Sequence, residues 1–316
     1  MPGRYESHYL RAVDPARPRG AWIRNTLHAR PGDAPTGALW CTVWDAEAGP
    51  PYAVKQSLPA PAPPEGARFD ASARAEALSA RFAGRAEAHG RSASWDLEAA
   101  GAQAALRHLP RAWMYRAPLP RTKPESPLPD AVFTGTLEAG GRRTEVAGWR
   151  GMVGHNWGSE HAERWVWLHA LGFAEAPGAW LDIALGRVQV GGRTTPWVAN
   201  GAVELDGSRM RVGGLGRVRS TRVDARPGAL QAVIGGAAAT IRVSVAAPLD
   251  QTVAFVYADP AGGEHHALNC SIAQVRLRVE RPGRPPVELA TAFGGAYELG
   301  MRQTDHGVPV QPFPDP

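Results

Sequence analysis

The sequence predicts an all-β protein made of two consecutive antiparallel β domains. Short stretches that alternate apolar and polar residues recur along the chain, and residues that favour tight turns separate them. In the second half, no convincing helical pattern lies between these stretches. A chain of 316 residues is long enough for two cores. We expect an N-terminal domain over residues 1–175 and a C-terminal domain over residues 176–316.

Several predicted hairpins turn at residue pairs that adopt positive φ readily. The clearest is 203-VELDGSRMRV-212, where Asp206 and Gly207 suit a two-residue turn. Similar turns are centred on residues 140–141, 191–192 and 282–283, and the stretches 86–97 and 253–268 alternate in the same way. This repetition excludes a parallel sheet with intervening helices and favours antiparallel sandwiches or barrels.

The first half carries two less regular patterns. The alanine-rich segments 70–84 and 97–109 have helical propensity. The proline-rich segments 58–66 and 117–130 lack backbone donors at several positions, which is incompatible with a central strand. We therefore expect these two segments to be loops, either across the surface or over the mouth of a cavity.

The charge pattern argues against nucleic-acid binding. Net charge is +5, and nearly all the positive charge is arginine, because Lys55 and Lys123 are the only lysines. The runs 217–222 and 276–284 alternate arginine with apolar residues, as the solvent face of an antiparallel strand does. A nucleic-acid-binding surface would instead concentrate basic residues beside exposed aromatic residues. We predict no nucleic-acid partner.

The cysteines and the hydrophobic runs indicate the compartment. Cys41 and Cys270 lie far apart and match neither a disulfide framework nor a metal-binding spacing. The first residues lack the pattern of a signal peptide, and no apolar run reaches the roughly 18 residues that a membrane span needs. We expect a cytoplasmic protein without stable membrane insertion, and its oligomeric state stays open.

Residues 164–173 form a candidate pocket wall. The strand period places Trp165, Trp167 and His169 on one face, and both faces of this stretch lack charge. Two buried indoles and an imidazole need hydrogen-bond partners, which either a partly hydrated pocket or backbone carbonyls in a packed core can supply. Aromatic walls with a few polar groups are typical of small-molecule sites.

The preceding turn, 154-GHNWGSEHAER-164, is rich in titratable groups. It is no nucleophile elbow, because Asn156 stands at the serine position, and no zinc helix, because Trp157 stands at a histidine position. His155, Glu160 and His161 could meet a metal ion only in an unusual geometry. We predict no metal and no cofactor, and acid–base chemistry by buried histidines and carboxylates remains.

A resemblance rests on several of these motifs. The stretch G-x-x-G-H-N-W-G-x-x-H-A-x-x-W-x-W-L-H within 148–173, 39-LWCTVWD-45, SASWDL at 92–97 and AYELG near the end resemble the lipocalin-like superfamily of carotenoid 1,2-hydratases and AttH-type proteins. Tocopherol cyclases and fungal Diels–Alderases look like distant members. The resemblance implies two consecutive lipocalin-like barrels or sandwiches, a hydrophobic polyene, isoprenoid or polyketide-like ligand, and often no cofactor.

The resulting hypothesis is a hydratase or cyclase that acts on such a ligand. A general acid protonates an alkene, aromatic walls stabilise the cation, and a base takes a proton from water. The catalytic candidates are His169, Glu160, His155 and Glu298, with His169 as the preferred base. The ligand-contacting candidates are Trp157, Trp165, Trp167, Asn156 and Tyr297. A carrier without catalysis and a pericyclase of secondary metabolism stay open as alternatives.

Overall fold

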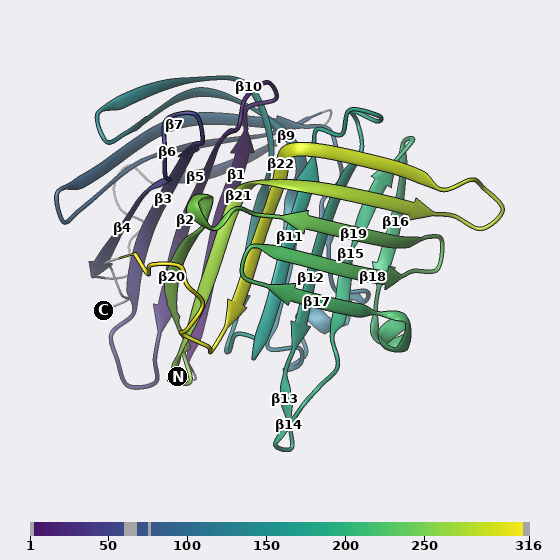
Figure 1. Ribbon diagram of the computed structural model, residues 1–316. Coiled ribbons are helices and arrows are strands. Elements are labelled where there is room, and N and C mark those ends of the chain that lie inside the picture. The colour runs from purple at the N-terminus through teal and green to yellow at the C-terminus, as the bar shows by residue number, and fades with distance from the viewer. Residues whose placement is uncertain (1–2, 60–67, 75–76, 312–316) are drawn as a thin grey trace.

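The computed structural model describes residues 3–59, 68–74 and 77–311, and within these ranges the chain is almost entirely β-structure. Two ten-stranded antiparallel sheets and one small hairpin make up the fold (Figure 1). The predicted all-β class with consecutive antiparallel units is therefore confirmed. The helical segments of the described residues are short 3-10 turns: η1 (Ala112–Tyr115), η2 (Leu215–Ser220) and η3 (Leu249–Gln251).

The first sheet contains the strands of the N-terminal half in the order β4-β3-β2-β1-β10-β9-β7-β6-β5, with β8 paired to β9. Its strands are β1 (Arg4–Val13), β2 (Arg19–Ala29), β3 (Thr36–Asp45), β4 (Tyr52–Pro59), β5 (Arg68–Arg74), β6 (Ala77–Ala88), β7 (Arg91–Gly101), β8 (Leu106–Arg107), β9 (Thr122–Ala139) and β10 (Arg142–Gly158).

The second sheet repeats this arrangement in the order β16-β15-β12-β11-β22-β21-β19-β18-β17, with β20 paired to β21. In both sheets the first strand pairs with the last strand. The strands are β11 (Arg164–Leu171), β12 (Trp180–Arg187), β15 (Val198–Leu205), β16 (Ser208–Gly213), β17 (Arg222–Arg226), β18 (Ala229–Gly235), β19 (Thr240–Ala246), β20 (Val253–Ala258), β21 (Glu264–Glu280) and β22 (Val287–Met301). The separate hairpin joins β13 (Gln189–Val190) to β14 (Arg193–Thr194).

One sheet curls into a nearly closed barrel, whereas the other forms a half-barrel. Polar contacts join the β4 end of the first sheet to β7: the Ser92 backbone N–H donates to the Tyr52 hydroxyl at 3.0 Å, and Arg91 donates to the Ala53 carbonyl at 2.9 Å. In the second sheet, β21 and β22 run beside the first sheet and then turn across the front layer (Figure 1). Register shifts between Cys270 and Val275 accompany this turn.

The predicted hairpins are confirmed. Asp206 and Gly207 have φ values of 55° and 71° between β15 and β16, as a two-residue hairpin turn requires. The turns at residues 140–141, 191–192 and 282–283 also connect paired strands, as do the stretches around 89–90 and 259–263. Local alternation and turn residues therefore predict these elements correctly.

The helical interpretation of the alanine-rich segments is wrong. Within the described residues, 70–84 belongs to β5 and β6, and 97–101 ends β7. On β7, Leu97 and Ala99 are buried while Glu98 is exposed, which is the period of a strand. Because β7 pairs with both β6 and β9, burial and sheet hydrogen bonds outweigh the helical propensity of alanine.

The loop expected over 117–130 is only partly present, because β9 begins at Thr122 and includes Pro124, Pro127 and Pro129. Along this part β9 pairs with β10 on one side and with only the two residues of β8 on the other. Register shifts interrupt the β10 ladder here, so the missing proline donors are tolerated. Most of the segment 58–66 lies outside the described residues.

The sheets change between Gly158 and Arg164, so β11 already belongs to the second sheet. One apolar cluster lies within the first sheet, but the larger cluster includes residues of both sheets. For example, Trp22 and Trp40 pack on Phe255, with ring centroids 5.9 and 4.9 Å apart. The two halves therefore share a core, and a boundary near residue 175 between separately folding domains stays a prediction.

Candidate functional site

Aromatic and polar side chains from both sheets meet at the junction between the sheets. Tyr9 of β1 packs edge-on against Trp167 of β11, with ring centroids 5.3 Å apart. Tyr9 fits because Gly154 on the neighbouring strand has no side chain; an added Cβ would lie 2.2 Å from the tyrosine ring. We define the junction cluster as Tyr9, Arg24, Trp165, Trp167, Tyr257, Asn269 and Glu298.

Glu298 of β22 is the carboxylate of the junction cluster, and it is only 8% exposed. Its Oε1 accepts a hydrogen bond from the Trp165 indole at 2.9 Å. Its Oε2 accepts from the Tyr257 hydroxyl and from the Asn269 amide, each at 3.3 Å. The carboxylate is therefore held by three donors on three different strands, which fixes its direction within the junction.

Arg24 of β2 completes the cluster from the first sheet. Its guanidinium carbon lies 4.2 Å from the ring centroid of Tyr257, and its Nε donates to Ser7 Oγ at 2.6 Å. Burial raises the pKa of Tyr257 and of Tyr9 well above the usual value of tyrosine. Both hydroxyls therefore stay protonated at neutral pH and can act as hydrogen-bond donors.

His169 lies on the same strand but has a different environment. It is fully buried, its Nε2 lies 3.0 Å from the Pro129 carbonyl, and its Nδ1 lies 3.2 Å from Nη1 of Arg11. Burial, together with the charge of Arg11, lowers the pKa of His169 to about 4. The neutral ring donates from Nε2 and accepts at Nδ1, so both nitrogens are engaged within the protein.

Trp167 contacts a second buried carboxylate, that of Asp182 on β12. Oδ1 of Asp182 lies 3.1 Å from His108 Nε2 and accepts from the Trp167 indole at 3.3 Å, while Oδ2 accepts from Ser126 at 2.5 Å. A nucleophilic triad needs a histidine between the serine and the carboxylate. Here the Asp182 carboxylate lies between Ser126 and His108 instead. This group therefore joins the two sheets and provides no activated serine.

His155 and Trp157 lie on the other face of β10 from Gly154. Their rings stack with centroids 4.6 Å apart, and His155 contacts Glu125 and Glu6 at 3.2 and 3.0 Å. Burial lowers the pKa of His155, but the two carboxylates outweigh burial and hold this pKa above its usual value. The structure does not bring these two candidates to the junction cluster.

The remaining sequence candidates are also dispersed. Glu160 forms an ion pair with Arg121 beside the turn that follows β10. Tyr297 donates to the carbonyls of Arg226 and Ala229 at 2.9 and 3.0 Å, on the opposite face of β22 from Glu298. Asn156 is half-buried, and its Oδ1 has no hydrogen-bond partner within the part of the chain that the structure describes. Of the nine predicted residues, the junction cluster unites Trp165, Trp167 and Glu298.

Sequence reasoning missed Arg24, Tyr257 and Asn269 as site residues. Arg24 follows the apolar residues 20–23, and a lone arginine directly after such a run indicates a buried partner. Asn269 lies in a stretch of histidines and polar residues within an apolar strand. Nothing local to Tyr257 distinguishes it from a core tyrosine.

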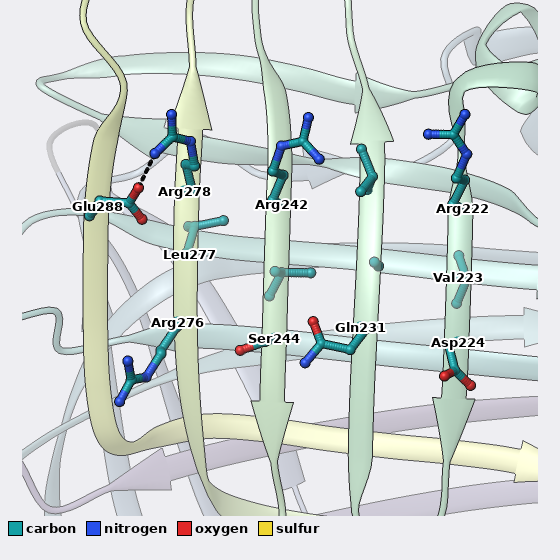
Figure 2. Close-up of a pocket in the computed structure, with 13 residues that line it drawn as sticks. Arg222, Val223, Asp224, Gln231, Arg242, Ser244, Arg276, Leu277, Arg278 and Glu288 are labelled. Atoms are coloured by element: carbon teal, nitrogen blue, oxygen red, sulfur yellow. Dashed lines mark hydrogen bonds and ion pairs between the residues drawn. The ribbon is translucent and has the colours of Figure 1, made fainter.

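The outer face of the second sheet carries a shallow cavity of about 530 Å³ (Figure 2). It is lined by Arg222, Val223, Asp224, Gln231, Ala232, Val233, Arg242, Val243, Ser244, Arg276, Leu277, Arg278 and Glu288. Arg278 pairs with Glu288 and Glu280, and Arg242 pairs with Glu280. The arginines over 276–278 thus lie on a strand face with mixed charge, whereas residues 217–220 of the other run belong to η2.

Among the described residues, two groups of side chains bring nitrogen and oxygen atoms within 4.8 Å of one another, at distances compatible with a metal ion. One consists of Glu6, His8 and His155 at the first sheet. The other consists of His161, Asp259 and His265 beside the junction cluster.

Across the part of the chain that the structure describes, no helix is long and apolar enough to cross a membrane.

Comparisons with known proteins agree with this architecture. No family model matches the chain. It is 31% identical over 317 aligned residues to the uncharacterised proteins MT0513 and Rv0493c from two strains of Mycobacterium tuberculosis, covering 96% of this chain and 88% of each relative.

Two solved structures share the fold across almost the whole chain. One is an AttH-type protein from Nitrosomonas europaea, with 15% identity and a TM-score of 0.53, covering 95% of this chain and 92% of that one. The other is CghA, with 12% identity and a TM-score of 0.58, covering 95% and 89%. CghA has also been solved with Sch210972. The fold implied by the sequence resemblance is thus confirmed.

Proposed function

This chain belongs to the family of the Mycobacterium tuberculosis proteins MT0513 and Rv0493c, and on its two-sheet fold we propose that it binds a hydrophobic small molecule at the junction cluster and hydrates or cyclises it by acid–base chemistry. The observation that carries this proposal is Glu298, a buried carboxylate held by an indole, a phenol and an amide. The ligand is an isoprenoid, polyene or polyketide-like molecule.

The chemistry follows from the groups around Glu298. In its protonated form, Glu298 donates a proton to one carbon of an alkene, whose π electrons form the new C–H bond and leave a carbocation. The faces of Trp165 and Trp167 stabilise this cation by roughly 1–2 kcal/mol each when water is excluded. Water attacks the cation in a hydratase, and an internal alkene or hydroxyl attacks it in a cyclase. The Glu298 carboxylate then takes the released proton.

In this proposal His169 positions Arg11 and does not act as the base. Both of its nitrogens are engaged and its ring is fully buried, so a ligand would have to displace Pro129 or Arg11 to reach it. The base role expected for His169 therefore passes to Glu298. His155, Glu160 and Trp157 lie away from the junction and take no part in the proposed step.

Glu298→Gln tests the proposal, because it keeps the size of the side chain and removes the proton. The protein is incubated with a metabolite extract, and mass spectrometry follows compounds that gain one water or change retention time without a change in mass. The wild type should convert such a compound, and Glu298→Gln should lose roughly 100-fold or more of the rate, the usual share of general acid–base catalysis. Glu288→Gln, on the outer face, is the matched control and should keep full activity.

The other outcomes separate the alternatives. A compound that is enriched on the protein but chemically unchanged indicates a carrier. Conversion that survives in Glu298→Gln indicates a pericyclase, which needs shape and hydrogen-bond donors but no proton transfer. His169→Phe in the same assay should keep the turnover of the folded fraction, and a 100-fold loss there would return the base role to His169.

A further inference from the structure

We propose that His161, Asp259 and His265 bind a divalent transition-metal ion. They come from three separate segments: the turn between β10 and β11, the residue after β20, and the start of β21. His265 is 104 positions from His161, so no local spacing reveals the group. This inference does not depend on the proposed function, although Trp165 lies between this group and Glu298.

The carboxylate of Asp259 lies between the two imidazoles. Its Oδ1 is 2.8 Å from His161 Nδ1, and its Oδ2 is 3.1 Å from His265 Nδ1. Metal ions of this class sit about 2.0–2.2 Å from nitrogen and oxygen ligands, which separates the ligands of a tetrahedral ion by roughly 3.3 Å. The two observed contacts lie close to this separation, and all three ligand atoms lie within 4.8 Å of one another, so modest side-chain movements would bring them around one ion.

Unsatisfied polar atoms point to a missing partner here. His265 is fully buried and Asp259 is 1% exposed. Among the described residues, neither ring nitrogen of His265 has an assigned hydrogen-bond partner, and Oδ2 of Asp259 has only ionic contacts, with His265 at 3.1 Å and with Arg302 at 3.5 Å. Buried polar atoms are nearly always satisfied, and a cation that accepts their lone pairs would satisfy both residues.

Two further contacts hold the group in place. The backbone N–H of His161 donates to Oδ1 of Asp259 at 2.9 Å, which leaves Oδ2 free to face His265. The ring of Tyr5 stacks on His161 with centroids 4.2 Å apart, and this fixes the plane of the imidazole. The ligands would therefore be oriented before the ion arrives, as metal sites require.

The ligand set indicates the class of ion. Two imidazoles and one carboxylate without a thiolate suit Zn²⁺, Fe²⁺, Co²⁺ and related ions more than Mg²⁺ or Ca²⁺. Three protein ligands leave a position for water or for a bound molecule. Nearby positive charges oppose the cation: the Arg302 guanidinium, held by Glu163 at 2.8 Å, lies 3.5 Å from Oδ2 of Asp259, and the charge of Arg24 also acts on His161.

The test uses the full chain after removal of metals with a chelator. Zn²⁺ affinity is measured by competition with a chromophoric chelator, and the visible spectrum of Co²⁺ reports the coordination geometry. The wild type should bind one equivalent, and His265→Asn should lose about 100-fold or more in affinity. Arg302→Gln should bind Zn²⁺ more tightly than the wild type, a change that general destabilisation would not produce.

His155→Gln is the matched control, because it removes the other histidine-containing group and should leave the affinity unchanged. Circular dichroism verifies folding, and Asp259→Asn replaces His265→Asn if the latter does not fold. No stoichiometric binding by the wild type would overturn the proposal. So would equal affinity in the wild type and the folded His265 or Asp259 variant, or loss of binding in His155→Gln alone.

Discussion

Asp182 joins the two sheets through one buried carboxylate, and its replacement should destabilise the whole molecule. Asp182 belongs to the second sheet, whereas Ser126 lies on β9 of the first sheet and His108 follows β8. Removing one partner of a buried, hydrogen-bonded charged group costs about 3–5 kcal/mol, because the other partners stay buried without an acceptor. We expect that loss in the free energy of unfolding for Asp182→Ala.

Asp182→Asn should have a smaller effect. The amide keeps one acceptor for His108 or Trp167 but loses the charge that strengthens the hydrogen bonds, which amounts to about 2 kcal/mol. Burial raises the pKa of Asp182, but His108, His169 and Ser126 together outweigh burial and hold this pKa below its usual value of 3.8. The stabilisation is therefore present above the unfolded-state pKa and is lost as pH falls through the folded-state pKa.

Urea unfolding followed by tryptophan fluorescence measures both effects, at neutral pH and on the acid side. The wild type should lose stability below about pH 4, and Asp182→Asn should lose less over the same range. The control is Asp224→Asn, an exposed aspartate of the same sheet paired with Arg226, which should leave the neutral-pH midpoint unchanged. The reasoning is refuted if Asp182→Asn unfolds at the wild-type urea concentration and keeps the wild-type acid sensitivity.

Two further predictions concern the site and the first sheet. Gly300→Ala would place a Cβ 2.0 Å from the Trp165 indole, so it should displace Trp165 from Glu298 and reduce conversion in the mass-spectrometric assay. The control is Gly178→Ala, whose added Cβ meets no atom within 4 Å. Equal activity of the two variants would contradict the role of Trp165 beside Glu298. His155 should titrate above its usual pKa in an NMR experiment, and Glu125→Gln should lower that midpoint because it removes one of the two carboxylates that stabilise the charged ring. The interaction of charged His155 with the two carboxylates stabilises the fold below the unfolded-state pKa of His155, and this stabilisation is lost as pH rises through the folded-state pKa. An unchanged midpoint in Glu125→Gln would show that other groups set the pKa of His155.

The fold class was predictable because its signals are local. A hairpin such as that at Asp206 and Gly207 depends on the φ angles of two residues and on the alternation of their neighbours. Alternation likewise placed Trp165 and Trp167 on one face of β11, and both contact the junction. Alanine-rich segments were misread because alanine fits a helix locally, and only pairing with β6 and β9 makes residues 97–101 a strand.

By itself, the sequence determined the hairpin turns and the alternating strands beside them, and it marked Glu298 as a carboxylate in an otherwise apolar strand. Only the tertiary structure decided what that carboxylate contacts: Asn269 is 29 positions away along the chain, Tyr257 is 41, and Trp165 is 133. The same holds for His169, whose partners Arg11 and Pro129 belong to the other sheet. Strand alternation assigns a side chain to a face, but sheet order, register and packing determine which distant face it meets.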